Sequence, residues 1–228
     1  MTLAIRLAVI VFLAATPALA DESGAAKGRT LYLVRHGAYH DTATTDPART
    51  LTPLGIAQAR LAAARLRGEA ATYASITSST LTRARETAQV IHTSLASVPL
   101  GENALLSECT PRTSEQRVAA GTTEEAMAAC EKQLDEAFQK YFIPAMGTEK
   151  TDILVAHGNM IRYLVLKALG LPTREWLRMT VGNASLTVIQ VRPDGTFRVA
   201  SVGDVGHIPP ELRSGSTAVT PQLVVPGR

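Results

Sequence analysis

Two short apolar runs, each followed at once by a histidine and a glycine, constrain the fold of this chain most. Residues 31–34 lead into Arg35-His36-Gly37, and residues 153–156 lead into His157-Gly158. A short apolar run is typical of a buried strand, and parallel sheets bind ligands at the carboxyl ends of their strands. We therefore expect both histidines at one edge of one sheet.

A third junction carries the same kind of residue. Residues 75–78 read as a strand, and the helix predicted over 81–95 contains Arg83. An arginine can bind a phosphate through two parallel hydrogen bonds, and an imidazole can attack it or donate to it. Gly158-Asn159 opens a further helix, whose free N–H groups also favour an anion. The three junctions together predict a site for a phosphorylated substrate, with Arg35, Arg83, His157, Gly158 and Asn159 as its binding residues.

The remaining pattern alternates strands with helices. Thr52-Pro53 is typical of a helix start, Thr122-Thr123-Glu124-Glu125 reads as a capping box, and residues 104–107 read as a brief extended segment. Residues 185–191 and 196–201 flank a turn of the sequence Arg-Pro-Asp-Gly and predict a hairpin. We expect one α/β domain: a three-layer α/β/α sandwich with a mostly parallel central sheet. Its predicted limits are 29–212, after a lead-in at 21–28 and before a flexible tail at 213–228.

The first twenty residues are predicted to be a signal peptide. Arg6 precedes a short apolar core, and Ala18-Leu19-Ala20 is an A-x-A cleavage pattern. The alternative is an uncleaved N-terminal anchor. With cleavage after Ala20, residues 21–228 have no stretch of 18 apolar residues, which predicts no membrane span in the mature protein. This pattern predicts a bacterial periplasmic or secreted location.

Composition excludes some classes of partner and site. The net charge is +3 and the basic residues are scattered, so nothing indicates a nucleic-acid partner.

Cys109 and Cys130 could pair in an oxidising compartment, although the position of Cys130 on an apolar helix stripe favours a buried thiol. His36 and His40 lie in a strand end and a loop with no cysteine beside them, so we expect no metal site. No cofactor is expected, and the oligomeric state cannot be predicted.

Five separated motifs occur in the order seen in the histidine phosphatase superfamily, the phosphoglycerate-mutase-like proteins. The chain resembles that superfamily from about residue 29 to 212. Within it, the chain is most similar to the branch that contains the mitochondrial phosphoglycerate-mutase-like serine/threonine protein phosphatase. The motifs are residues 33–37, residues 51–55, Ser79-x-Leu81-x-Arg83-Ala84-x-x-Thr87, Leu106-Ser107-Glu108 and His157-Gly158-x-x-Ile161-Arg162.

The resemblance implies a role for each matching residue. His36 would be the nucleophile that becomes a phosphohistidine, and Arg35, Arg83 and His157 would surround the transferring phosphoryl group. Glu108 would protonate the leaving oxygen. The implied activity is a metal-independent phosphomonoester hydrolase that acts on phosphoproteins, on phosphate esters of the cell envelope or on a small nutrient phosphate.

Two other functions remain open. A non-catalytic protein could keep the fold and only recognise a phosphorylated partner. Phosphoryl transfer of the phosphoglycerate mutase type is the second, but members with that activity commonly carry a glutamate directly after the RHG motif, where this chain has Ala38. Glu108 is also followed by Cys109 instead of the glycine common in the family. Tyr39, His40 and Arg112 could line the entrance or be ordinary loop surface.

Overall fold

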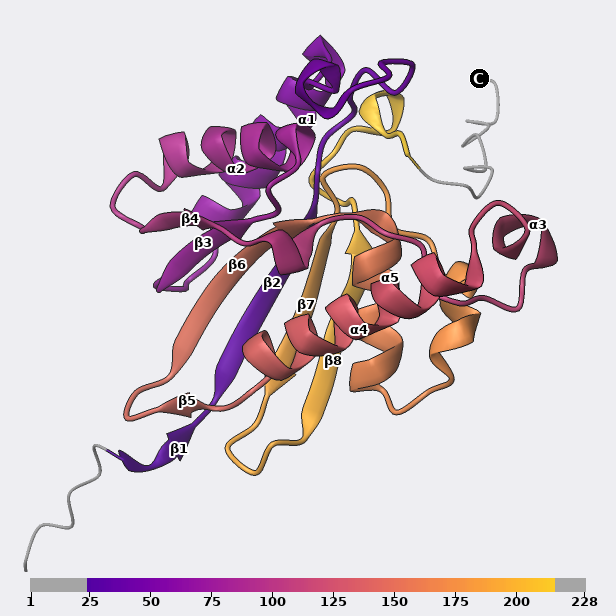
Figure 1. Cartoon of the computed structure of the whole chain (residues 1–228). Helices are drawn as coiled ribbons and strands as arrows, with labels where there is room; N and C mark the ends of the chain where they lie inside the picture. Colours follow the sequence, from indigo (N-terminus) through magenta and orange to yellow (C-terminus); the bar gives the residue numbers. More distant parts are fainter. Residues whose placement is uncertain (1–23, 216–228) are drawn as a thin grey trace, which may run out of the picture.

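A six-stranded sheet forms the centre of the computed structural model, which describes residues 24–215 (Figure 1). Its strand order is β4-β3-β6-β2-β7-β8. Four neighbouring strands are parallel: β4 (Leu100–Glu102), β3 (Ser75–Ser78), β6 (Lys150–Ala156) and β2 (Arg29–Arg35). The hairpin of β7 (Leu186–Val191) and β8 (Phe197–Asp204) adds two antiparallel strands beside β2. The predicted mostly parallel sheet is confirmed.

Helices cover both faces of this sheet (Figure 1). On one face, α1 (Pro53–Arg67) and α2 (Thr82–Ser94) pack against Ile153 and Val155 of β6. On the other face, α4 (Glu124–Tyr141) and α5 (Gly158–Ala168) pack against Leu154 of β6 and Leu31 of β2. Successive strand residues point to opposite faces, so the continuous apolar runs of β2 and β6 supply both cores. The three-layer α/β/α sandwich is therefore confirmed.

Strand register places the two histidines side by side. Arg35 at the end of β2 is the register partner of Ala156 at the end of β6, and the next residues are His36 and His157. Ser78, the last residue of β3, pairs with Val155, so the junction that leads to Arg83 opens at the same edge. Parallel pairing brings the three junctions together, as the sequence predicts.

Helix starts follow the predicted capping chemistry with one correction. The hydroxyl of Thr52 accepts a hydrogen bond from the backbone N–H of Gly55 at 3.2 Å and caps α1. In α4 the cap is Thr123, which accepts from the backbone N–H of Ala126 at 3.2 Å. The reading of Thr122 to Glu125 as a capping box is wrong, because this start places Ala126 instead of a glutamate at the third helical position.

Three further features differ from the sequence-based expectation or go beyond it. Of residues 104–107, predicted to be extended, Ala104–Leu106 forms a 3-10 helix after the short strand β4, and only Ser107 is extended. Within the predicted lead-in, β1 (Ala26–Lys27) pairs with β5 (Ala145–Met146) in a separate two-stranded sheet. Cys109 and Cys130 form a disulfide with their Cα atoms 5.6 Å apart, so Cys130 is buried as half of a disulfide and not as a thiol.

At the two ends of the chain, the structure describes only some of the residues that the sequence-based predictions cover. The proposed signal peptide at 1–20 lies outside the described residues. Of the predicted tail, residues 213–215 are described, and Ser214 donates to the side-chain oxygen of Asn183 at 3.1 Å. Among residues 24–215, no helix has the length and apolar character that crossing a membrane requires.

Candidate active site

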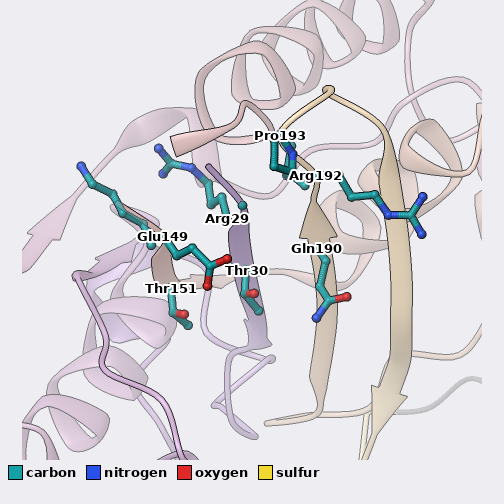
Figure 2. A pocket seen from close by; sticks show the side chains of 10 residues that line it. Arg29, Thr30, Glu149, Thr151, Gln190, Arg192 and Pro193 are labelled. Atoms are coloured by element: carbon teal, nitrogen blue, oxygen red, sulfur yellow. The ribbon is translucent and has the colours of Figure 1, made fainter. Parts of the chain in front are cut away.

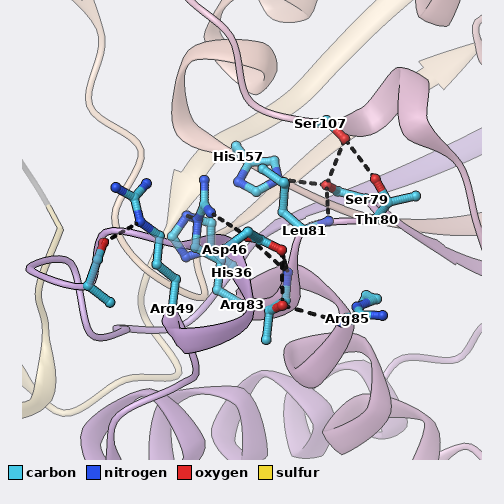
Figure 3. A network of polar contacts seen from close by, with 12 residues as sticks. His36, Asp46, Arg49, Ser79, Thr80, Leu81, Arg83, Arg85, Ser107 and His157 are labelled. Atoms are coloured by element: carbon cyan, nitrogen blue, oxygen red, sulfur yellow. Dashed lines mark hydrogen bonds and ion pairs between the residues drawn. The ribbon is translucent and has the colours of Figure 1, made fainter.

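Side chains from the three junctions converge at the carboxyl edge of the sheet (Figure 3). The rings of His36 and His157 have their centroids 5.0 Å apart. Nε of Arg83, on α2, donates to Nε2 of His36 at 3.3 Å. All three side chains are buried, with 2%, 0% and 5% of their surface exposed for His36, His157 and Arg83. The sequence-predicted residues thus form one enclosed cluster.

Hydrogen bonds fix which nitrogen of His36 carries hydrogen. Nδ1 lies 2.8 Å from the backbone oxygen of Gly37, and because that oxygen can only accept, Nδ1 is the donor. On the other side of the ring, Arg83 donates to Nε2. Both contacts leave Nε2 unprotonated, which is the state that a nucleophilic imidazole needs.

Burial and neighbouring cations keep both imidazoles neutral. Burial lowers the pKa of His36 well below its ordinary value of 6.5, and the guanidinium of Arg35 lowers it further. Burial also lowers the pKa of His157, followed by the effect of His36 beside it. Taking two charged rings out of water next to two arginines is unfavourable, so both stay neutral at pH 7.

Arg35 extends its guanidinium across the start of α5. A Cβ atom on Gly158 would lie 3.4 Å from the central carbon of that guanidinium, at van der Waals distance, so the arginine lies against the backbone at this glycine. Nη1 of Arg35 donates to the backbone oxygens of Val181, at 2.6 Å, and of Gly215. Its Nε is buried and has no hydrogen-bond partner within residues 24–215. A guanidinium anchored on one side and unpaired on the other can receive an anion.

Two residues of the loop 38–51, Asp46 and Tyr39, contact Arg83. The carboxylate of Asp46 lies 3.8 Å from Nη1 of Arg83 and also accepts from the hydroxyl of Thr82 at 3.0 Å. The ring of Tyr39 lies under the guanidinium at 4.9 Å and meets the ring of His36 edge-on at 5.1 Å. These contacts hold Arg83 over the imidazole that it bonds.

Glu108 lies at the N-terminal end of α5. Its Oε2 accepts from the backbone N–H of Asn159 at 3.5 Å, while the side-chain amide of Asn159 donates to the backbone oxygen of Cys109 at 3.1 Å. Burial raises the pKa of Glu108, and Arg35 opposes that rise most strongly. Its Oε1 is enclosed and unpartnered in the described part of the chain. A carboxyl group with a raised pKa can hold a proton for donation.

Several residues that hold the site were not predicted. The backbone oxygen of His36 accepts from the amide of Asn183 at 3.0 Å, and the backbone N–H of Gly37 donates to Thr87 at 3.1 Å. Ser79 contacts Nε2 of His157 at 2.8 Å. Ser79 and Thr87 lie inside a quoted motif and could have been found there, whereas Asn183 precedes β7 and carries no sequence signal. Of the proposed entrance residues, His40 is exposed and Arg112 pairs with Glu124 and Glu131.

Two glycines bring the loop after His36 against α1. A Cβ atom on Gly37 would lie 2.5 Å from the backbone oxygen of Gly55, and one on Gly55 would lie 1.9 Å from the oxygen of Ala38. Real Cβ atoms do not approach backbone so closely, so only glycine fits at both positions. The contact fixes the path of the backbone immediately after His36.

A separate cavity of about 250 Å³ lies at the opposite edge of the sheet (Figure 2). Thr151, Thr30 and Gln190 share one register row across β6, β2 and β7 and line its floor. No residue of the histidine cluster lines this cavity. Among residues 24–215, no group of three His, Cys, Asp or Glu side chains could hold a metal ion.

Comparison with known proteins identifies the family. The model of the histidine phosphatase superfamily (branch 1) matches residues 31–142 and 112–205. The chain is 36% identical over 187 residues to the serine/threonine-protein phosphatase PGAM5, mitochondrial, of Xenopus tropicalis, covering 80% of this chain and 67% of the relative. It is 34% identical over 196 residues to the Homo sapiens protein of the same name, covering 84% and 68%.

Solved structures show the same fold at lower identity. Bacillus stearothermophilus YhfR aligns with a TM-score of 0.63 at 23% identity, over 79% of this chain and 100% of that chain. Phosphoserine phosphatase from Entamoeba histolytica aligns with a TM-score of 0.60 at 22% identity, over 79% and 100%. These alignments support the predicted phosphoglycerate-mutase-like fold.

The expected periplasmic or secreted location is contradicted by these relatives. The matching phosphatases are named mitochondrial. The same finding contradicts the signal-peptide interpretation of residues 1–20. One arginine before a short apolar run does not identify the cellular destination, because targeting segments for different membranes share a positive charge and apolar residues.

The family model, the relatives and the fold agree with one another and with the motifs that carry the clustered residues. They confirm the expected class of enzyme, a histidine phosphatase. The chain belongs to the histidine phosphatase superfamily, on the branch of the PGAM5 phosphatases.

Proposed function

We propose that this phosphatase hydrolyses phosphomonoesters through a phosphohistidine on Nε2 of His36, without a metal ion or other cofactor. The observation that carries the proposal is the unprotonated Nε2, defined by the bond from Nδ1 to Gly37 and by the bond that Nε2 accepts from Arg83. A neutral imidazole with this tautomer carries its lone pair on Nε2, and the lone pair can attack phosphorus once the N–H of Arg83 turns from Nε2 to a phosphoryl oxygen.

The proposed first step transfers the phosphoryl group to His36. The lone pair of Nε2 forms the N–P bond while the P–O bond of the ester breaks, and the proton of Glu108 goes to the leaving oxygen. Proton donation to an alkoxide leaving group is worth roughly 10²–10⁴-fold in rate. The enclosed Oε1 of Glu108 and the raised pKa of its carboxyl group support this role.

The second step returns the enzyme to its starting state. Water attacks phosphorus, its proton passes to the carboxylate of Glu108, and the N–P electron pair returns to Nε2 as inorganic phosphate leaves. Throughout, Arg35, Arg83 and His157 would bind the phosphoryl oxygens as charge spreads over them. The backbone N–H groups at Gly158 and Asn159, at the start of α5, would add to this binding.

We propose phosphoserine and phosphothreonine residues of proteins as the substrates, and residues 29–212 as the catalytic domain. The names of the relatives, serine/threonine-protein phosphatases, support the substrate class. Mutase-type transfer between two positions of one metabolite is the second candidate, and Ala38 after the motif counts against it. A hydrolase releases inorganic phosphate, whereas a mutase yields an isomer of its substrate.

The test uses the full chain with an aryl phosphate and a phosphothreonine peptide in the presence of EDTA. We expect turnover of both, and an acid-labile phosphoenzyme after rapid quenching. His36→Ala should lose both signals. His40→Ala is the matched control, because this exposed histidine lies four residues away and outside the cluster. Binding of phosphate esters without turnover or labelling would overturn the proposal in favour of a non-catalytic phosphate-binding protein.

A further inference from the structure

Ser79 is fully buried between His157 and the segment that carries Glu108 (Figure 3). Its hydroxyl oxygen lies 2.8 Å from Nε2 of His157 and 3.3 Å from the hydroxyl of Ser107. The other ring nitrogen of His157, Nδ1, is buried and has no hydrogen-bond partner in the described chain. Nδ1 is therefore the nitrogen that remains for a bound group.

The hydrogen bonds around Ser79 restrict the direction of its own proton. The backbone N–H of Leu81 donates to the hydroxyl oxygen at 3.1 Å, and a backbone N–H can only donate. The one hydroxyl hydrogen can go to a single acceptor: Nε2 of His157, or the oxygen of Ser107, toward which Ser79 also has donor geometry. The contact with His157 is the shorter one. Ser107 has its own hydrogen and can donate to the hydroxyl of Thr80, 3.2 Å away.

We propose that Ser79 is a positioning residue that donates its hydroxyl hydrogen to Nε2 of His157 and so fixes the tautomer with hydrogen on Nδ1. In this tautomer His157 donates from Nδ1 to an oxygen of the transferring phosphoryl group. The inference rests on the proposed function, because it assigns to Ser79 the control of one of the groups that bind the phosphoryl oxygens.

The tautomer matters because His157 is neutral in its buried position. A neutral imidazole carries one hydrogen, so only one of its nitrogens can donate. With hydrogen on Nε2, the ring would turn a lone pair toward negatively charged oxygens, and the interaction would become repulsive. The hydroxyl of Ser79 selects the favourable form before substrate binds. This is pre-organisation through a residue that does not touch the substrate.

The direct test is the ¹⁵N NMR spectrum of the full chain labelled in its histidines, with His157→Gln used to assign the ring signals of His157. We expect a protonated Nδ1 and an unprotonated, hydrogen-bonded Nε2. Ser79→Ala should remove this preference, and Ser79→Thr, which keeps the hydroxyl, should restore it. Hydrogen on Nε2 of His157 in the unmodified protein would overturn the proposal, since Ser79 would then donate to Ser107.

Kinetics provide the second readout. Ser79→Ala should lower kcat for an aryl phosphate by about 10–100-fold, the usual cost of losing a residue that orients a functional histidine, with a much smaller change in KM. Ser79→Thr should recover most of the rate. Thr80→Ala is the matched control: it removes a neighbouring exposed hydroxyl that contacts Ser107 and not His157, so kcat should stay within about twofold.

The two readouts separate the two proposals. If the unmodified chain has the expected tautomer but no phosphatase activity, the proposed function fails and the contact of Ser79 with His157 stands only as structure. If the chain is active and folded Ser79→Ala keeps the full kcat, the role of Ser79 fails while the proposed function stands. Melting curves of each variant check that the comparison is between folded proteins.

Discussion

Nε of Arg83 and Nε2 of His36 lie 3.3 Å apart, although one side chain comes from α2 and the other follows β2. The positively charged guanidinium of Arg83 therefore lies next to Nε2 of His36, the atom that would bond to phosphorus. A planar guanidinium can stay near Nε2 and still direct its other N–H groups to phosphoryl oxygens. The contact connects the nucleophile and the group that neutralises the transferring charge.

Replacing Arg83 by lysine should preserve charge but lose this geometry. We expect Arg83→Lys to lower kcat/KM by about 10²–10³-fold, the usual cost of removing one oriented donor from a transition-state site. Steady-state kinetics with an aryl phosphate measure the effect. Arg85→Lys, at an exposed position on the same helix, is the control and should change kcat/KM little. Equal activity of the two variants would contradict the assigned role of Arg83.

Glu108→Gln should affect substrates according to their leaving groups. An alkyl phosphate needs a proton on its leaving oxygen, so its kcat should fall by roughly 10²–10⁴-fold. An aryl phosphate with an acidic phenol should lose much less, because its leaving oxygen is stable without a proton. Rates for a series of phosphate esters measure this difference. A uniform loss across the series would assign Glu108 to substrate binding instead of proton transfer.

The free energy of unfolding should decrease as the pH falls below about 6.5. The pKa of His36 and of His157 is lowered in the folded protein, so the unfolded chain binds more protons below the ordinary value of 6.5. Their contribution is complete above that pH, and each can remove up to about 1.4 kcal/mol per pH unit below it. Glu108, with a raised pKa, acts in the opposite direction: its contribution is complete below pH 4.5 and is lost as pH rises through the folded value.

Urea unfolding at pH 5.5 and pH 7 measures this dependence. His157→Asn removes one of the two titrating rings and should reduce the loss of stability between these pH values. His40→Asn, at an exposed position, should leave the loss unchanged. A loss in His157→Asn as large as in the unmodified protein would show that His157 is not held neutral by burial.

The sequence was sufficient for the parts of the site that lie at strand ends. The apolar runs before His36 and His157 predicted parallel strands, and parallel pairing alone brings their carboxyl ends together. The β1–β5 pair could not be predicted, because Ala26–Lys27 is too short to show a pattern and its partner lies far along the chain. The pairing of Cys109 with Cys130 depends on a Cα separation that no spacing in the sequence reveals.

The role of supporting residues was harder to predict for a different reason. Asn183 bonds the backbone oxygen of His36 because the segment before β7 passes beside the junction after β2, which is a property of the assembled sheet. The N-terminal segment differs from Asn183, because it has a recognisable sequence pattern that does not determine its cellular destination. Its local pattern was clear, but one pattern of charge and apolar residues serves several cellular destinations, so the predicted location was wrong.

Removing the disulfide should lower stability more than activity toward aryl phosphates. Cys109→Ala combined with Cys130→Ala opens a loop with a sequence separation of 21, and we expect a loss of about 2–4 kcal/mol in the free energy of unfolding. Urea unfolding of the double variant measures it. Reduction of the unmodified protein should give a similar loss, and a double variant as stable as the oxidised protein would contradict the prediction.

Gly37→Ala should impair the enzyme without touching any charged group. The added Cβ would lie 2.5 Å from the backbone oxygen of Gly55, so either the segment after His36 or the start of α1 must move. We expect a lower melting temperature and a large fall in kcat. Gly101→Ala, where nothing lies within 4 Å of the added atom, should keep both values near those of the unmodified protein.

The close approach of Gly37 and Gly55 also has a consequence for how this enzyme can be redesigned. The backbone that leaves His36 passes Gly55 at a point where neither chain segment has a side chain that could be exchanged for a slightly larger or smaller one. Changes of specificity must therefore come from other residues around the cluster, such as Tyr39, whose ring contacts both His36 and Arg83. The path of the backbone after His36 itself leaves no room for gradual adjustment.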